Sequence, residues 1–153
     1  MLSSLHKHIL CLFLTSGLLI ISCTLPEGLK PVSGVEGDLT FEGTWPDSIK
    51  AASLIALDDL DLDNPGNHLI SYSDPIMPGD TLAHFFIQLK PGSYYLATVG
   101  LTVEPVIFAA KLDSFKTAQK LPIVIIENDL IAIVTPVRVK YEEITIINRK
   151  IIF

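Results

Sequence analysis

An acidic segment near the middle of the chain has aspartates at alternate positions, in the spacing of a calcium-binding loop: Asp59, Asp61 and Asp63. Alternate carboxylates can converge on a hard cation such as Ca²⁺. The EF-hand form also needs Gly at its sixth position and Glu at its twelfth, where this chain has Asn64 and Ile70, so that form is excluded. A looser site would take further oxygen ligands from Asp58, Asp74 or Asp80. The alternative is a solvated strand end that leads into an Asn-Pro-Gly turn.

Few other residues have the types and spacing that chemistry needs. His68 and His84 are the only histidines after position 8, and zinc would need more nitrogen or sulfur ligands at local spacing. The chain has no Gly-x-Ser-x-Gly nucleophile motif, and no sequence feature singles out a pair of carboxylates for hydrolysis. We therefore predict no catalytic residues, no cofactor-binding residues and no enzymatic activity.

Aromatic side chains are the remaining candidates for a binding surface. Those that could line a sugar- or peptide-binding face are Trp45, Tyr72, Phe86, Tyr94 and Tyr95. Tyr94 and Tyr95 are neighbours in a predicted strand, so they must face opposite sides of the sheet. One of the two is then a core residue, and only a contiguous exposed patch would indicate a partner.

The elements that position these residues follow an N-terminal segment with the organisation of a signal peptide. A basic start that includes Lys7 precedes the apolar stretch Ile9–Ile21. As a helix this stretch would be about 20 Å long, short of a hydrocarbon core of about 30 Å. We therefore predict a cleaved signal peptide over residues 1–22 rather than a transmembrane anchor.

The end of that stretch, Leu19-Ile20-Ile21-Ser22-Cys23, resembles the processing site of bacterial lipoproteins. The resemblance implies cleavage before Cys23, a diacylglyceryl group on its sulfur and usually a third chain on the new amino terminus. Two or more chains anchor a protein stably to a membrane. Thr24 follows, rather than the Asp associated with inner-membrane retention, which favours the outer membrane. The alternative is an ordinary Cys23 after a plain secretory signal.

Composition limits the rest of the chain. Residues 23–153 are enough for one domain with its own core. The only other cysteine, Cys11, lies in the signal peptide, so a disulfide framework is excluded. The net charge of −6 argues against nucleic acid as a partner. Residues 23–33, with Cys23 at their start, read as a lipidated linker because they contain two prolines and no hydrophobic period.

From residue 34 onward the sequence predicts mainly strands, with alternating or continuous apolar runs. The predicted strands are Asp38–Glu42, Ile49–Leu57, Leu82–Leu89, Ser93–Leu101, Leu121–Ile126, Leu130–Val134 and Val137–Phe153, the last broken near Tyr141–Glu143. Leu82–Leu101 is expected to form an antiparallel hairpin around a type II turn at Lys90-Pro91-Gly92-Ser93. Only Phe108–Lys120 has helical spacing, from Phe108, Leu112 and Phe115, and a packed loop is the alternative.

Two of these segments resemble transthyretin-like, carboxypeptidase-regulatory-like domains. Leu89–Leu96 is similar to their L-x-P-G-x-Y-x-L motif, and Gly34–Phe41 to their G-x-V-x-G-x-V-T opening strand. Trp45–Leu57 and Pro136–Phe153 resemble a strand pair and the closing strands of some bacterial lipoproteins. The resemblance implies an all-β, seven-stranded Greek-key sandwich over residues 34–153, transthyretin-like or Ig-like, with at most one short helix. It implies an accessory, binding or structural module and carries over no catalytic residues.

We therefore expect an envelope-anchored lipoprotein that serves as a binding or structural module. Its partners would be the membrane, through the lipid, and an envelope protein or glycan. The alternative is a calcium-dependent or carbohydrate-binding accessory domain. The candidate surface is the segment Asp58–Asp80, which is longer than the family pattern and is expected to be a polar, turn-rich excursion that the core does not need.

Overall fold

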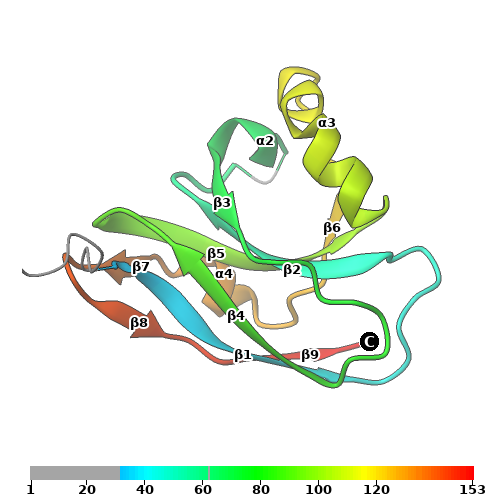
Figure 1. Cartoon of the computed structure of the whole chain (residues 1–153), viewed down its shortest axis with the longest axis horizontal. Helices are drawn as coiled ribbons and strands as arrows, with labels where there is room; N and C mark the ends of the chain where they lie inside the picture. Colours follow the sequence, from blue (N-terminus) through cyan, green and yellow to red (C-terminus); the bar gives the residue numbers. More distant parts are fainter. Residues whose placement is uncertain (1–31, 62) are drawn as a thin grey trace, which may run out of the picture. The chain divides into compact units, whose positions relative to one another are not determined.

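A computed structural model describes residues 32–61 and 63–153, which form two β-sheets and a helical layer (Figure 1). The predicted signal peptide, Cys23 and most of the linker lie outside the described residues. The strands are β1 (Gly34–Glu42), β2 (Ala51–Leu57), β3 (Leu69–Tyr72), β4 (Leu82–Gln88), β5 (Gly92–Leu101), β6 (Ile123–Ile125), β7 (Val137–Val139), β8 (Ile144–Ile146) and β9 (Arg149–Ile152). The helices are α2 (Pro65–His68), α3 (Pro105–Thr117) and α4 (Leu130–Val134).

The first strand lies in the middle of the first sheet. On one side β1 pairs antiparallel with β4, and on the other it pairs parallel with β8 and then with β9. The break between β8 and β9 faces Gly37. There Ile147 N donates to Glu36 O at 2.8 Å, and Asp38 N donates to the Asn148 Oδ1 at 3.0 Å. The side-chain amide of Asn148 therefore supplies a hydrogen bond to β1 at the point where main-chain pairing between β1 and the β8–β9 segment is interrupted.

The second sheet has the order β3-β2-β5, and β6 and β7 follow one another along the far edge of β5. The pairing of β2 with β5 is its longest, from Ala51 opposite Leu101 to Leu57 opposite Tyr95. This pair forms the centre of the sheet, because strands or bridging residues flank it on both sides.

The main core lies between the two sheets. The alternation predicted for β1 and β4 is confirmed: Leu39, Phe85 and Ile87 are buried, and Asp38 and His84 are exposed. Facing residues of the second sheet belong to the same buried cluster, which includes Ala52, Leu54, Ala56 and Leu96. The first sheet thus buries one face and exposes the other, as its alternating sequence requires.

Both faces of the second sheet are covered, because α2 and α3 pack on the side away from the first sheet (Figure 1). Phe108 is buried in this second cluster, and Leu112 and Phe115 pack against it. The helix predicted from the spacing of these three residues is therefore confirmed. Double coverage explains why every residue of β2 is buried and why that segment is apolar or small throughout.

The predicted hairpin Leu82–Leu101 is wrong. β4 pairs with β1 and β5 pairs with β2, so the turn between them crosses from one sheet to the other. The turn is also not type II, because a type II turn needs a positive φ at Gly92. Gly92 does not have one, and it is already the first residue of β5. The Pro-Gly pair reverses the chain, but the burial pattern on each side decides which sheet each strand joins.

The segment Leu130–Val134 is a helix, not the predicted strand. The Asp129 carboxylate caps it, accepting from Ile131 N at 3.0 Å and Ala132 N at 3.3 Å. With α2 and α3, the described part of the chain has three helices, more than the one expected. It also has nine strands rather than seven. Leu130–Val134 is not a strand, β3 was not predicted, and the predicted segment Val137–Phe153 holds three strands, β7, β8 and β9.

A buried ion pair fastens the segment before α4 to β9 of the other sheet. The Glu127 carboxylate lies 3.9 Å from Arg149 Nε, with side-chain exposures of 1% and 9%. Thr98 Oγ1 donates to Glu127 at 2.9 Å, and Arg149 Nη2 donates to Ala132 O at 3.2 Å. The Arg149 Nε–H has no acceptor among the described residues. These polar groups therefore link the two sheets at one side of the sandwich.

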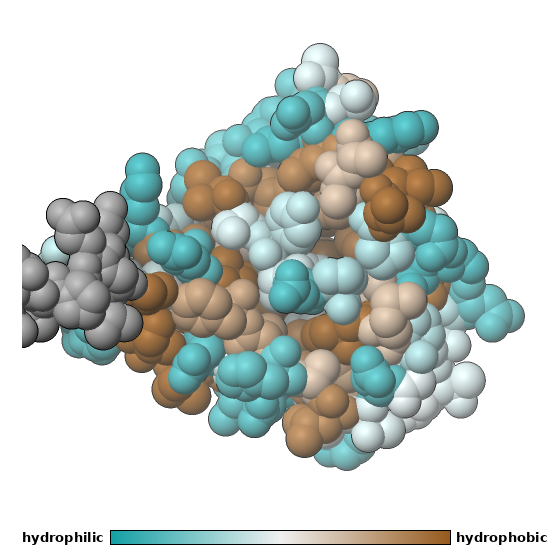
Figure 2. All heavy atoms as spheres, viewed as in Figure 1, coloured by the Kyte–Doolittle hydropathy of each residue, from teal (hydrophilic) through white to brown (hydrophobic). Residues whose placement is uncertain are grey.

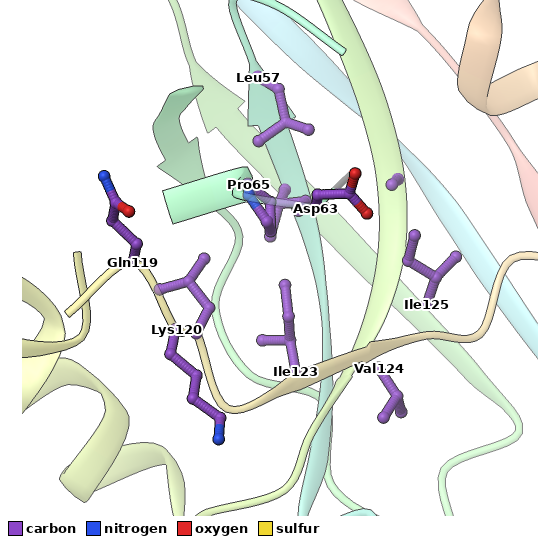
Figure 3. Close-up of a pocket in the computed structure, with 11 residues that line it drawn as sticks. Leu57, Asp63, Pro65, Gln119, Lys120, Ile123, Val124 and Ile125 are labelled. Carbon is purple, nitrogen blue, oxygen red and sulfur yellow. The ribbon is translucent and has the colours of Figure 1, made fainter. Parts of the chain in front are cut away.

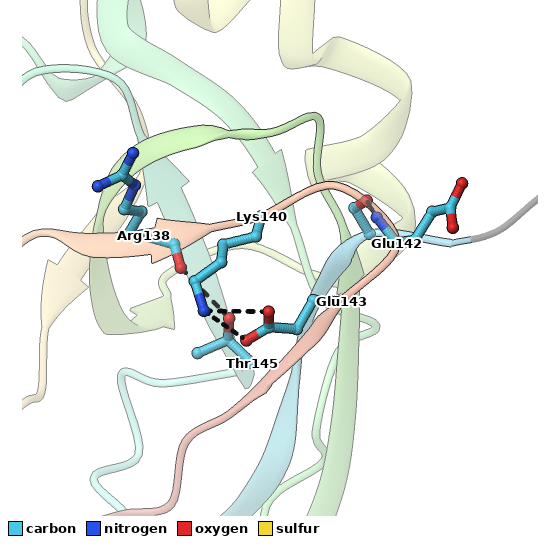
Figure 4. A network of polar contacts seen from close by, with 6 residues as sticks. Arg138, Lys140, Glu142, Glu143 and Thr145 are labelled. Atoms are coloured by element: carbon cyan, nitrogen blue, oxygen red, sulfur yellow. Dashed lines mark hydrogen bonds and ion pairs between the residues drawn. The ribbon is translucent and has the colours of Figure 1, made fainter.

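Ser33, just before β1, is hydrogen-bonded to the turn between β7 and β8, whose polar contacts are shown in Figure 4. Glu142 N donates to Ser33 Oγ at 2.8 Å, and Leu89 N donates to Ser33 O at 3.0 Å. The turn is closed by Lys140, whose Nζ lies 3.1 Å from Glu143 Oε2. Exposed Tyr141 has a raised pKa because its phenol hydrogen-bonds with the Glu142 carboxylate and feels its negative charge.

Candidate functional site

A pocket of about 470 Å³ opens between the second sheet and the loops beside α2 and α3 (Figure 3). Its floor is formed by Ile55, Leu57 and Ala97, which are at most 2% exposed. These three residues project from β2 and β5, the longest strand pair of the sheet. The floor of the pocket is therefore apolar and is carried by the most extensively paired part of the fold.

The walls come from β6 and from the loop that follows α3. Leu121, Ile123 and Ile125 line the pocket on this side. The β6 residues are held by pairing with Val99–Leu101 of β5, so they keep a fixed place beside the floor. Ile125 is 42% exposed because it stands at the mouth of the pocket. An apolar ligand would cover this side chain along with the floor.

Asp63 and Lys120 are the ionisable residues among those that line the pocket. In Figure 3 the Asp63 carboxylate points toward the space that Leu57 and Ile125 border, whereas the ammonium of Lys120 points away from it. No described residue donates a hydrogen bond to the Asp63 carboxylate or pairs with it. The pocket thus offers one carboxylate to a ligand, together with the aliphatic stem of Lys120.

A turn held by Asp61 places Asp63 at the pocket. The Asp61 Oδ1 accepts from Asp63 N and from Asn64 N, both at 3.1 Å. Such carboxylate–backbone bonds fix a turn without regular secondary structure. The helix α2 then begins at Pro65 and leads into β3, whose first residue is tied to α3, since Lys116 Nζ donates to Leu69 O at 3.0 Å.

The structure places the predicted calcium ligands in separate roles. Asp59 Oδ1 accepts from Leu60 N at 2.8 Å, Asp61 holds the turn, and Asp63 faces the pocket. Asp58 Oδ1 lies 3.0 Å from the Nδ1 atom of His68. Over residues 32–61 and 63–153, no three His, Cys, Asp or Glu side chains are grouped to hold a metal ion. Calcium binding stays a prediction.

The two histidines lie apart, each beside a different aspartate. His68 Nδ1 is near Asp58 at the start of the acidic segment, and His84 Nδ1 lies 3.1 Å from Asp38 Oδ1 on the exposed face of the first sheet. The expectation that His84 is a surface residue is confirmed. His68 is the last residue of α2 and His84 lies in β4, so the two histidines do not form a shared site.

Most of the candidate aromatic residues are used in packing. Tyr72 meets Phe108 edge to face at 5.5 Å. Trp45 packs with its ring centroid 4.8 Å from those of Phe41 and Phe153. On the molecular face shown in Figure 2, apolar groups alternate with polar ones rather than forming one patch. These contacts favour a structural role for the aromatic residues.

Tyr94 and Tyr95 face opposite sides of β5, as predicted. Tyr94 packs against the core between the sheets and donates its hydroxyl to Lys90 O at 3.0 Å. Tyr95 packs against the cluster under the helices. Both are half-buried because the sheet is covered on its two faces. Of the five candidate aromatics, Phe86 is exposed, at 42%, and the other four are half-buried.

The segment Asp58–Asp80 is not a dispensable excursion, which corrects the sequence-based expectation. It contains α2 and β3, and Ile76 is buried in the main core and bridges to Ala52. Buried Ser73 accepts a hydrogen bond from Leu54 N at 3.0 Å. Deleting the whole segment would therefore remove an edge strand and core contacts.

Comparisons of the chain with protein-family models, with curated protein sequences and with solved structures found no match. None of the helices in the described part of the chain has the length and apolar character to cross a membrane. The pocket was not predicted from the sequence, because its lining comes from segments between Ile55 and Ile125 that the fold brings together. Asp63 was singled out, but as a metal ligand.

Proposed function

We propose that this chain is a lipid-anchored protein of the bacterial cell envelope, held in the outer membrane through Cys23, and that it works by binding rather than by catalysis. The lipoprotein-like sequence Leu19–Cys23 supports the anchor. Packing of the described chain starts at Ser33, directly where the Pro-containing linker ends. A linker of this composition lets a domain reach away from the surface to which it is anchored.

We also propose that the domain belongs with the transthyretin-like sandwiches. If β8 with β9 and β6 with β7 are each counted as one interrupted strand, the two sheets hold seven strand positions. The chain passes from β1 to β2 and β3 in the second sheet and returns as β4 beside β1. A fourth strand that returns beside the first is one element of the Greek-key pattern, which supports the proposal.

The ligand site is the pocket above β2 and β5, and the observation that carries this assignment is its size and lining. Ligand pockets in proteins usually measure about 300–1,000 Å³, are mostly apolar and contain a few placed polar groups. A pocket of about 470 Å³ with Ile55, Leu57 and Ala97 as its floor and Asp63 at its side fits that description. Binding would cover the exposed apolar side chains of Val124 and Ile125, each 42% exposed.

The test is calorimetric titration of octanol, a neutral apolar probe, into nanodiscs that carry the intact lipidated protein, with empty nanodiscs subtracted. We expect saturable binding, and we expect Ile125→Trp and Gln119→Trp, which narrow the pocket, each to weaken it at least about tenfold. Ile152→Trp is the control, since Ile152 is 53% exposed on β9 outside the pocket. Octanol binding that is absent, or equal in all four proteins, would contradict this assignment.

A further inference from the structure

The two ionisable side chains of the pocket, Asp63 and Lys120, are oriented differently. The pocket is bordered by the carboxylate of Asp63, whereas Lys120 contributes its stem and carries its ammonium outward (Figure 3). The other lining side chains are uncharged, and Gln119 is the polar one among them. A ligand that fills the apolar floor would therefore meet a single negative charge, which no described residue neutralises.

The loop that carries Asp63 adds further negative charge on that side of the pocket. The loop that carries Asp63 also carries three further carboxylates, at Asp58, Asp59 and Asp61. The whole chain has a net charge of −6. Like charges gathered near a cleft raise the local concentration of ions of opposite sign and speed their association. Cations are therefore favoured over anions on the Asp63 side of the pocket before any direct contact forms.

We propose that the pocket takes a cationic amphiphile: a molecule with an apolar body and one protonated amine. This rests on the proposed function, and it adds the class of ligand. The apolar body lies on Ile55, Leu57 and Ala97, and the ammonium donates to Asp63. A hydrogen bond between an ammonium and a carboxylate is stronger than one between neutral groups.

The alternative recognition group is Lys120, which would favour an anionic amphiphile if its ammonium turned inward. The two readings differ in which probe binds best and in which substitution removes the preference. Lys120→Met keeps an apolar stem of similar length and removes the charge. It should leave the preference for an amine unchanged if Asp63 is the recognition group, and abolish a preference for a carboxylate if Lys120 is.

The experiment compares octylamine, octanol and octanoate by calorimetric titration into nanodiscs that carry the intact lipidated protein, with empty nanodiscs subtracted. We expect octylamine to bind about tenfold more tightly than octanol, and octanoate more weakly than both. Asp63→Asn should bring octylamine to the level of octanol and leave octanol binding unchanged. Asp80→Asn, an exposed aspartate outside the pocket lining, should keep the preference. Added salt should reduce it.

The outcomes separate the two proposals. Octanol that binds as well as octylamine, with Ile125→Trp still weakening both, would overturn the amine assignment and leave the pocket as a binding site. A preference for octanoate that Lys120→Met removes would also overturn it. Failure of all three probes to bind would overturn the proposed function itself. Equal effects of Asp63→Asn and Asp80→Asn would show that only overall charge matters and would refute the contact with Asp63.

Discussion

A side chain on Gly37 would collide with Ile147, because a Cβ built there lies 1.7 Å from the carbonyl oxygen of Ile147. The contact occurs where the parallel partner of β1 is interrupted, and the φ of Gly37 is +157°. The first and last parts of the folded chain therefore approach so closely that only glycine fits between them.

Gly37→Ala should destabilise the protein by at least about 2 kcal/mol, because backbone atoms rather than a flexible side chain must move. Denaturant unfolding monitored by circular dichroism measures the loss. Gly79→Ala is the matched control: Gly79 has φ +99° but nothing within 4 Å of the added methyl. Its cost should be only the left-handed conformation, about 1–2 kcal/mol. Equal losses would show that the contact with Ile147 is unimportant.

Glu127→Leu should cost about 3 kcal/mol or more, because it leaves the Arg149 charge buried without its partner. Adding Arg149→Met should recover much of that loss, which a double-mutant cycle of unfolding free energies measures. The exposed pair Lys150–Glu42 is the control: at 2.8 Å it is closer than the 3.9 Å of the buried pair. Breaking it should cost less than about 1 kcal/mol. A larger loss there would contradict the argument from burial.

Cys23→Ala should abolish incorporation of labelled fatty acid and release the protein from the membrane fraction, because it removes the sulfur that we propose receives the lipid. Metabolic labelling followed by fractionation measures both effects. The chain offers its own control in Cys11, whose substitution by Ala should leave labelling intact. Wild-type protein that stays in the membrane fraction without label would refute the lipid anchor.

Glu142→Gln should lower the pKa of Tyr141 toward 10.0, because it removes the carboxylate that raises it. The phenol pKa is higher in the folded state than in the unfolded state. The resulting stabilisation is therefore full below the unfolded pKa and is lost as pH rises through the folded pKa. Phenolate absorbance against pH, with Tyr141→Phe subtracted, isolates this group. An unchanged titration in Glu142→Gln would assign the shift to another cause.

The elements that the sequence predicted correctly are those whose pattern is local. Phe85 and Ile87 alternate with exposed neighbours, and Phe108, Leu112 and Phe115 repeat at helical spacing. These patterns indicate which face of an element is buried, so the prediction does not depend on knowing which element packs against it. The same logic succeeded for Tyr94 and Tyr95, which face opposite sides.

The wrong predictions are those that depend on contacts between elements or on which local signal prevails. Pro91 and Gly92 reverse the chain, but a turn does not state whether its two strands pair or enter different sheets. At Leu130–Val134 the apolar run suited a strand, and the capping carboxylate of Asp129 favoured a helical turn instead. The pocket has no local signature, since its floor at Leu57 and its mouth at Ile125 belong to strands far apart in sequence.

The junction at Ser33 has a mechanical consequence if the chain is tethered through Cys23, as we propose. A pull on the segment before Ser33 acts along β1, which lies between β4 on one side and β8 and β9 on the other. Rows of hydrogen bonds on both flanks would then be loaded in shear together, instead of opening one at a time as in unzipping. Because β9 runs parallel to β1, stretching the domain between Ser33 and Phe153 would load the same rows. The strand nearest the tether is thus the one best placed to resist force.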